Sequence, residues 1–153
     1  MSAKKIVDEI VKLIKDPETV GLATLRHYPM ERRIYRWFGA CGFSLELVRY
    51  EGGRKRRVAV LVEARARTAG RGRLKGYEKS GGSVRCVIAE EVNGGLKYRV
   101  LRGSYRDMEE LFRAVEAVRS AFYERYRALK PEIKEKEVFH VAGIPDDELL
   151  LGV

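Results

Sequence analysis

The feature that most constrains the fold is a stretch of 22 residues, Arg54 to Lys75, in which an apolar run has basic residues on both sides. The middle of the stretch, residues 57–65, reads RVAVLVEAR and is the most apolar run of the chain. An apolar run of this length, preceded by the turn-forming Gly52-Gly53, is typical of a buried central strand. We therefore predict a sheet that is built around this strand.

The basic flanks hold most of the net charge of the chain. The stretch contains nine lysines and arginines and one acid, Glu63, so it carries +8 of a net charge of +9. A lone carboxylate in an apolar strand is either paired with a cation or placed to hold something charged. The concentration of positive charge favours a polyanionic partner.

The composition indicates one domain with a core of its own. The chain has 153 residues, of which 45% are hydrophobic and 35% are charged, with no glutamine and one asparagine, a balance typical of thermophilic proteins. No apolar run approaches the roughly 18 residues of a membrane span, and the N-terminus is not signal-like. We therefore expect a cytoplasmic protein with no membrane partner. Cys41 and Cys86 lack metal-ligand spacing, and we expect two buried thiols rather than a disulfide.

Helical periodicity predicts two helices and a weaker helical turn in the first part of the chain. Ser2 can cap a first helix that runs to about Lys15. A short helical turn is expected over residues 18–25, followed by an irregular link. A second helix is expected from Glu31 to about Ala40, with its apolar residues turned inward: Ile34, Trp37 and Phe38.

Alternation of apolar and polar residues predicts two hairpins. Residues 43–50 alternate and then turn through Gly52-Gly53 into the apolar run. Residues 83–92 and 96–101 are expected to pair across Asn93-Gly94-Gly95. The connection at 70–82 carries Leu74 and Tyr77 at helical spacing and is expected to form a short helix. The fold class is thus α+β, with a mixed four- to five-stranded sheet built from two hairpins and flanked by helices.

The C-terminal part begins with the longest predicted helix. A capping box at residues 104–107 opens this helix, which is expected from Tyr105 to Leu129 and to be ended by Pro131. A strand-like piece follows at 137–141, and residues 146–153 place three acids before three leucines. Such a tail docks either on its own body or on a partner. The single domain, 1–153, then comprises a helical part (1–40), a sheet core (43–102), the long helix (104–130) and the tail (131–153).

Three short motifs within residues 31–102 resemble a known nuclease family. They read ERRIYRWFGACGF at 31–43, VLVEAR at 60–65 and RLKGYEKSGGSV at 73–84. The first resembles the acid-bearing helix of archaeal Holliday-junction resolvases, which runs into a Gly-Phe and the first strand. The second is similar to the apolar strand that ends in an acid-x-lysine pair, and the third to the helix, glycine step and strand that follow. The chain thus resembles the PD-(D/E)xK nuclease superfamily.

The resemblance implies a resolvase-type fold and a Mg²⁺-dependent endonuclease site. It places Glu31 and Glu63 as metal-binding acids, with Arg65 where the family has lysine. The family's intervening aspartate is missing, because no aspartate occurs between Asp16 and Asp107. Glu46 can replace that aspartate only if it points to the same side as Glu63.

The substituted residues predict a degenerate site. Cleavage needs two or three acids that converge on the metal, and Arg65 is poorly suited to proton transfer. The candidate catalytic residues are Glu31, Glu46, Glu63 and Arg65, and Mg²⁺ is a cofactor only if the nuclease interpretation holds. Glu63 has a second interpretation, as a core carboxylate paired with Arg65 or with an arginine of a neighbouring strand.

The basic residues of the stretch indicate binding to nucleic acid. They can follow a phosphate backbone from a hairpin tip to the segment beyond the strand: Arg54, Lys55, Arg56, Arg57, Arg65, Arg67, Arg71, Arg73 and Lys75. Nothing resembles a base-reading helix, so we predict binding directed by shape or by the phosphate backbone. The resemblance favours DNA over RNA as the partner, and the residues alone leave the two open. The alternative is a non-catalytic accessory subunit that binds a protein partner, or a second copy in a homodimer, through residues 105–129 and 144–153.

Overall fold

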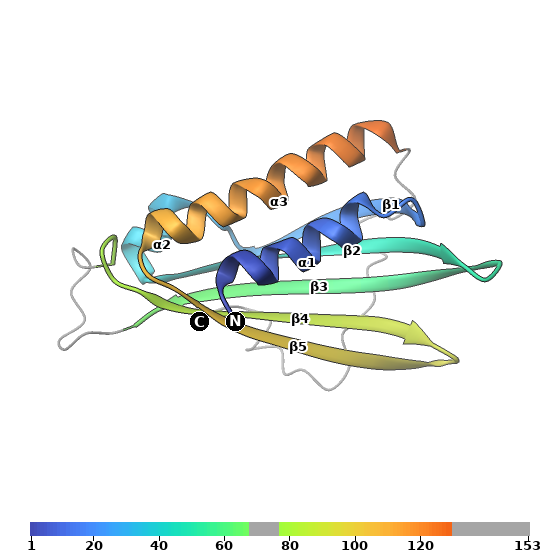
Figure 1. The fold of residues 1–153 in the computed structure, drawn as a ribbon, viewed down its shortest axis with the longest axis horizontal. Coiled ribbons are helices and arrows are strands. Elements are labelled where there is room, and N and C mark those ends of the chain that lie inside the picture. Colours follow the sequence, from blue (N-terminus) through green and yellow to red (C-terminus); the bar gives the residue numbers. More distant parts are fainter. Residues whose placement is uncertain (68–76, 130–153) are drawn as a thin grey trace.

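A computed structural model describes residues 1–67 and 77–129 of the chain (Figure 1). The described residues form five strands, β1 (Thr19–Tyr28), β2 (Ala40–Glu51), β3 (Arg54–Ala66), β4 (Gly82–Val92) and β5 (Gly95–Tyr105). The helices are α1 (Ala3–Lys15), α2 (Arg32–Phe38) and α3 (Met108–Ala128). The expected strand at 137–141, Pro131, the tail at 144–153 and most of the helix expected at 70–82 lie outside the described residues.

The sheet is a simple antiparallel meander. Its strands lie in chain order, β1-β2-β3-β4-β5, and all four pairings are antiparallel. The α+β class and both hairpins are therefore confirmed, whereas the sheet is antiparallel rather than mixed. Figure 1 shows α1 and α3 lying side by side across one face of the sheet.

The edge strand β1 corrects one expectation. The sequence pattern favours a helical turn over 18–25, but residues 19–28 pair with β2 instead. Thr19, Val20, Thr24 and Tyr28 are good strand formers. Without β1, the backbone groups along one side of β2 would lack partners, so pairing across the sheet outweighs the weak local preference for helix.

Alternation along β3 divides its side chains between two faces. Even-numbered residues point at the helices and are buried in the main core: Val58, Val60, Val62, Ala64 and Ala66. Opposite them in the core lie Ile6 and Ile10 of α1 and Leu111, Phe112 and Val115 of α3. Odd-numbered residues therefore lie on the other side, which we call the outer face: Arg57, Ala59, Leu61, Glu63 and Arg65.

The helix ends confirm one capping prediction and correct another. Ser2 caps α1, since its hydroxyl accepts a hydrogen bond from the Lys5 N–H at 3.2 Å. The predicted Ser104 cap of the long helix is wrong, because residues 103–105 still pair with β4. The cap is Asp107, whose carboxylate accepts from the Glu110 N–H at 2.8 Å.

Helix α2 is shorter than expected and turns different residues inward. It ends at Phe38 because Gly39 takes the left-handed conformation, with φ +66°. Tyr35 is its fully buried residue, and the Tyr35 hydroxyl lies 2.5 Å from that of Tyr105. Trp37 and Phe38, expected inside, are 62% and 59% exposed.

Two further expectations concern the thiols and the membrane. Cys41 and Cys86 are both free and buried, as predicted, and burial raises the pKa of each thiol to about 12. None of the described helices is long and apolar enough to cross a membrane.

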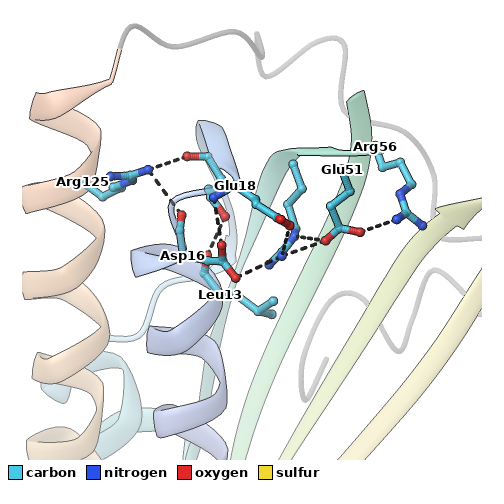
Figure 2. A network of polar contacts seen from close by, with 8 residues as sticks. Leu13, Asp16, Glu18, Glu51, Arg56 and Arg125 are labelled. Carbon is cyan, nitrogen blue, oxygen red and sulfur yellow. Dashed lines mark hydrogen bonds and ion pairs between the residues drawn. The ribbon is translucent and has the colours of Figure 1, made fainter. Parts of the chain in front are cut away.

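A polar network joins four elements at the end of the sheet where α1 stops (Figure 2). Arg49 of β2, with a side chain only 11% exposed, lies 3.1 Å from Asp16, 3.3 Å from Glu18 and 2.8 Å from Glu51. Figure 2 also shows Arg125 of α3, which donates to the backbone carbonyls of Asp16 and Thr19 at 3.3 and 2.8 Å. The network therefore connects the turn between α1 and β1 with strand β2 and with helix α3.

Arg49→Gln removes the cation that three carboxylates share, and we expect it to lower the free energy of unfolding by about 1.5–3 kcal/mol at neutral pH. The hydrogen bond from the Glu18 N–H, together with the charge of Arg49, holds the pKa of Asp16 below its ordinary value of 3.8. A carboxyl with a lowered folded-state pKa stabilises the protein above its unfolded-state pKa, and this stability is lost as the pH falls through the folded-state pKa. The difference between wild type and variant should therefore be largest above about pH 4 and shrink below it.

Urea unfolding of both proteins across this pH range checks the prediction. The control is Arg113→Gln, which removes an exposed cation of α3 and should change stability by less than about 0.5 kcal/mol. Equal losses in the two variants, or a difference that does not change with pH, would show that the network does not stabilise the fold.

Candidate nucleic-acid interface

Strand β3 divides the described part of the basic stretch into two clusters. Arg54 and Arg65 lie eleven residues apart in one continuous strand. At ~3.3 Å per residue their Cα atoms are about 36 Å apart. Arg71, Arg73 and Lys75 lie outside the described residues. The charges that are close in sequence are thus held at opposite ends of the sheet.

The first cluster, which we call the tip cluster, comprises Arg54, Lys55, Arg56 and Arg57. It follows the turn from β2 to β3, where Gly52 and Gly53 take φ values of +56° and +79°. Glycine adopts this left-handed backbone without strain, as a two-residue hairpin turn requires. The predicted turn is therefore confirmed.

Acidic side chains offset much of the charge of the tip cluster. Arg56 forms an ion pair with Glu51, and the Arg57 guanidinium lies 3.6 Å from Glu46. The Arg57 backbone N–H donates to the Glu91 carboxylate at 3.2 Å. An open groove of about 870 Å³ separates this turn from the β4–β5 turn, and both acids and cations line it. This mixed charge makes the tip a weaker candidate for polyanion binding.

The second cluster, which we call the arginine cluster, comprises Arg65, Arg67 and Arg102. Arg102 of β5 lies directly opposite Arg85 of β4, which lies opposite Glu63 of β3, so these three side chains share the outer face. Arg65 lies two residues beyond Glu63 on the same face, and Arg67 follows the end of the strand. Arg65, Arg67 and Arg102 are exposed and have no ion-pair partner among the described residues.

Sequence reasoning misses Arg102 because it lies outside the basic stretch. The second hairpin is expected to end at Leu101, whereas β5 continues to Tyr105. The alternation of Tyr98, Val100 and Arg102 could have placed Arg102 on the outer face, had the strand been extended by one more residue.

Glu63 forms an ion pair across the sheet. One of its carboxylate oxygens lies 2.6 Å from the Arg85 guanidinium, and the two side chains are 21% and 19% exposed. Their positions directly opposite each other on β3 and β4 explain the contact. The pairing agrees with the interpretation of Glu63 as a carboxylate held by an arginine of a neighbouring strand.

The structure does not bring the three candidate catalytic acids together, nor the two that were expected to bind metal. Glu46 shares the outer face with Glu63 but is 1% exposed and lies opposite Ala59, four residues before Glu63. This offset corresponds to about 13 Å. Glu31 lies on the helix side, where it borders a cavity of about 60 Å³ under α3 and approaches Arg26 at 3.9 Å.

This separation bears directly on Mg²⁺ binding. Protein oxygens bind Mg²⁺ at about 2.0–2.1 Å, so two carboxylates that share one ion lie within roughly 4 Å of each other. Within residues 1–67 and 77–129, no group of three His, Cys, Asp or Glu side chains could hold a metal ion. Glu31, Glu46 and Glu63 therefore cannot share one Mg²⁺ ion, and Arg65 lies on the outer face two residues beyond Glu63.

Comparison of the sequence with protein-family models, with curated proteins and with solved structures found no match, so the site is interpreted from its own geometry.

Glu63→Ala removes the carboxylate from a mostly buried ion pair and should lower the free energy of unfolding by about 1.5–3 kcal/mol. A double-mutant cycle with Arg85→Ala, measured by urea unfolding, should give a coupling energy of about 1–2 kcal/mol. The control is Glu116→Ala, which breaks an exposed ion pair with Arg119 on α3 and should cost less than about 1 kcal/mol. A stable Glu63→Ala variant with no coupling would contradict the structural role and return Glu63 to the list of candidate catalytic residues.

Proposed function

We propose that the protein binds nucleic acid through its phosphate backbone, and that the arginine cluster is the principal contact. The observation that carries this proposal is the pair of arginines that face each other on β4 and β5. Arg85 and Arg102 are directly opposite, and like charges in this position destabilise a sheet. Glu63 offsets one of the two charges. A bound phosphate would offset the other.

The surrounding charges support the same conclusion. Many arginines elsewhere on the described surface have an acidic partner, as in Arg32–Glu109, Arg36–Glu78 and Arg106–Glu110. Arg65, Arg67 and Arg102 instead leave three guanidinium groups open to solvent at one end of one face. A guanidinium presents paired N–H donors that match the oxygens of a phosphate.

Contacts to phosphate position a nucleic acid without reading its sequence. We therefore propose binding that tolerates different sequences. Only the resolvase-like motifs favour DNA over RNA, so both belong in the assay. The degenerate nuclease-like site stays a prediction, and Mg²⁺-dependent cleavage would require acids beyond the separated Glu31, Glu46 and Glu63.

Arg65→Gln, Arg67→Gln and Arg102→Gln combined should weaken binding to DNA of any sequence. The logarithm of affinity falls linearly with the logarithm of salt concentration, and each lost phosphate contact should reduce that slope by about one unit. Fluorescence anisotropy with labelled DNA and RNA over a salt series measures both quantities. A triple variant of the tip cluster, Arg54→Gln, Lys55→Gln and Arg56→Gln, should reduce the affinity and the salt slope less.

A matched control removes three exposed cations from α1: Lys4→Gln, Lys12→Gln and Lys15→Gln. This variant has the same net charge as the triple arginine variant but should keep most of the affinity. An equal loss in both variants would show that net charge alone drives binding. Absence of wild-type binding at low salt would contradict the proposed function.

A second candidate function, binding of a protein partner, has one observation in its favour. A groove runs between the edge strand β1 and α3, and its lining includes Tyr123 and Tyr126, which are 51% and 39% exposed. Edge strands accept an added strand from another chain. A change of oligomeric mass in a Tyr123→Ser, Tyr126→Ser variant would favour this function, and so would such a change on deletion of residues 144–153.

A further inference from the structure

We infer that the nucleic acid bound at the arginine cluster is an unpaired strand, and that Trp37 and Phe38 stack on its bases. The inference rests on the proposed function, because it specifies the ligand of the same site. It begins from two large aromatic side chains that the fold leaves in solvent although it buries Tyr35 of the same short helix completely.

The position of these two residues, which we call the aromatic ledge, is fixed by the backbone that follows them. The Gly39 N–H donates to the Tyr35 carbonyl at 2.7 Å, and the Gly39 carbonyl accepts from the Ala66 N–H at 2.6 Å. The Tyr77 ring packs so closely on Gly39 that an added Cβ would lie 2.8 Å from it. The ledge is therefore held against the end of β3 and is not a frayed helix end.

The ledge lies next to the arginine cluster. Ala66, which binds Gly39, is the residue between Arg65 and Arg67. Trp37 is two residues from Gly39, so its Cα lies within about 13 Å of that of Ala66, given 3.8 Å per Cα step and about 5 Å between paired strands. The Phe38 ring also contacts Tyr28 at 5.4 Å between centroids, and Tyr28 packs with Leu61 and Val87 on the outer face. A few nucleotides can span this distance.

The charge around the ledge favours a polyanion over a protein surface. Arg33 precedes Trp37 by one helical turn, and Arg65 and Arg67 lie on either side of Ala66; all three are exposed. Arg36, next to Trp37, is paired with Glu78 at 2.9 Å, so this pair adds no net charge. Protein interfaces usually have a mixed polar rim. Cations that surround exposed aromatic rings are instead the combination that binds single-stranded nucleic acid, in which phosphates meet the charges and bases stack on the rings.

An unpaired strand is required because the bases of a duplex are already stacked on one another. Only unstacked bases can present a ring face to a side chain. Stacking also tolerates any base, which agrees with the sequence-tolerant binding proposed above. The arginine cluster alone can bind duplex phosphates, so the ledge determines the preference for single strands.

Trp37 is the only tryptophan of the chain, so its fluorescence reports on the ledge alone. A 12-nucleotide oligothymidylate should quench this emission with the same Kd that anisotropy of a labelled oligonucleotide gives. A duplex of equal length should bind more weakly and quench little. Trp37→Leu and Phe38→Leu should each weaken single-strand binding by about 5- to 100-fold and leave duplex binding unchanged. Tyr123→Leu, which removes an exposed aromatic ring from α3, is the control and should change neither.

The outcomes separate this inference from the proposed function. Binding that depends on Arg65, Arg67 and Arg102 but does not quench Trp37 would overturn the inference and leave the proposed function standing. Equal affinity and equal quenching with the duplex would also overturn it. If neither nucleic acid binds, both ideas fail. If the Trp37→Leu, Phe38→Leu double variant turns an oligomer into a monomer by light scattering, the ledge is a protein interface and the inference is wrong.

Discussion

The register of β3 between β2 and β4 is the constraint on which the rest of the structure depends. Side chains alternate between the faces of a strand, so a shift by one residue would move every buried residue to the other side. Val58, Val60 and Val62 under the helices fix the register, because a one-residue shift would move them from the main core to the outer face. The charged residues follow as a consequence, and Glu63 and Arg65 are forced onto the outer face.

The same strand explains why the basic stretch does not act as one surface. Its length places the tip cluster and the arginine cluster at opposite ends of the sheet. The charged residues on neighbouring strands then determine the net charge around each cluster. At the tip, Glu51, Glu46 and Glu91 lie close to the cations. At the other end, Arg102 arrives from β5 and adds to the positive charge. The function that we propose therefore depends on cross-strand neighbours rather than on the charge of a sequence window.

The sequence predicts those features that depend on local chemistry. The Gly52-Gly53 and Asn93-Gly94 turns require left-handed backbone, the apolar run marks the central strand, and Ser2 satisfies the first turn of α1. The features that it misses depend on partners far along the chain. β1 is a strand because β2 offers it a free edge, and Asp107 replaces Ser104 as the cap because β4 holds β5 in extended form as far as Tyr105.

The arrangement of the candidate site also depends on contacts between distant parts of the chain, which the sequence does not predict. Short motifs suggest that Glu31 and Glu63 belong together, but the fold places one on the helix side and the other on the outer face. The sequence does not predict the exposure of Trp37 and Phe38 either, because a helix of seven residues is too short for its apolar pattern to define a buried face. The hydrogen bond between Gly39 and Ala66 brings the backbone at this end of α2 beside the strand that carries Arg65 and Arg67, and no local pattern predicts that contact.

The central claim is that one end of the outer face, beside α2, is the nucleic-acid surface. Backbone amide chemical shifts, followed by NMR while a short single-stranded oligonucleotide is added, test this claim most directly. We expect the shifts to change at Trp37 and Phe38, at Arg65 to Arg67, and at Arg102 to Ser104, with little change along α1 and the outer side of α3. Changes confined to the β1–α3 groove, or to the β2–β3 turn, would contradict it.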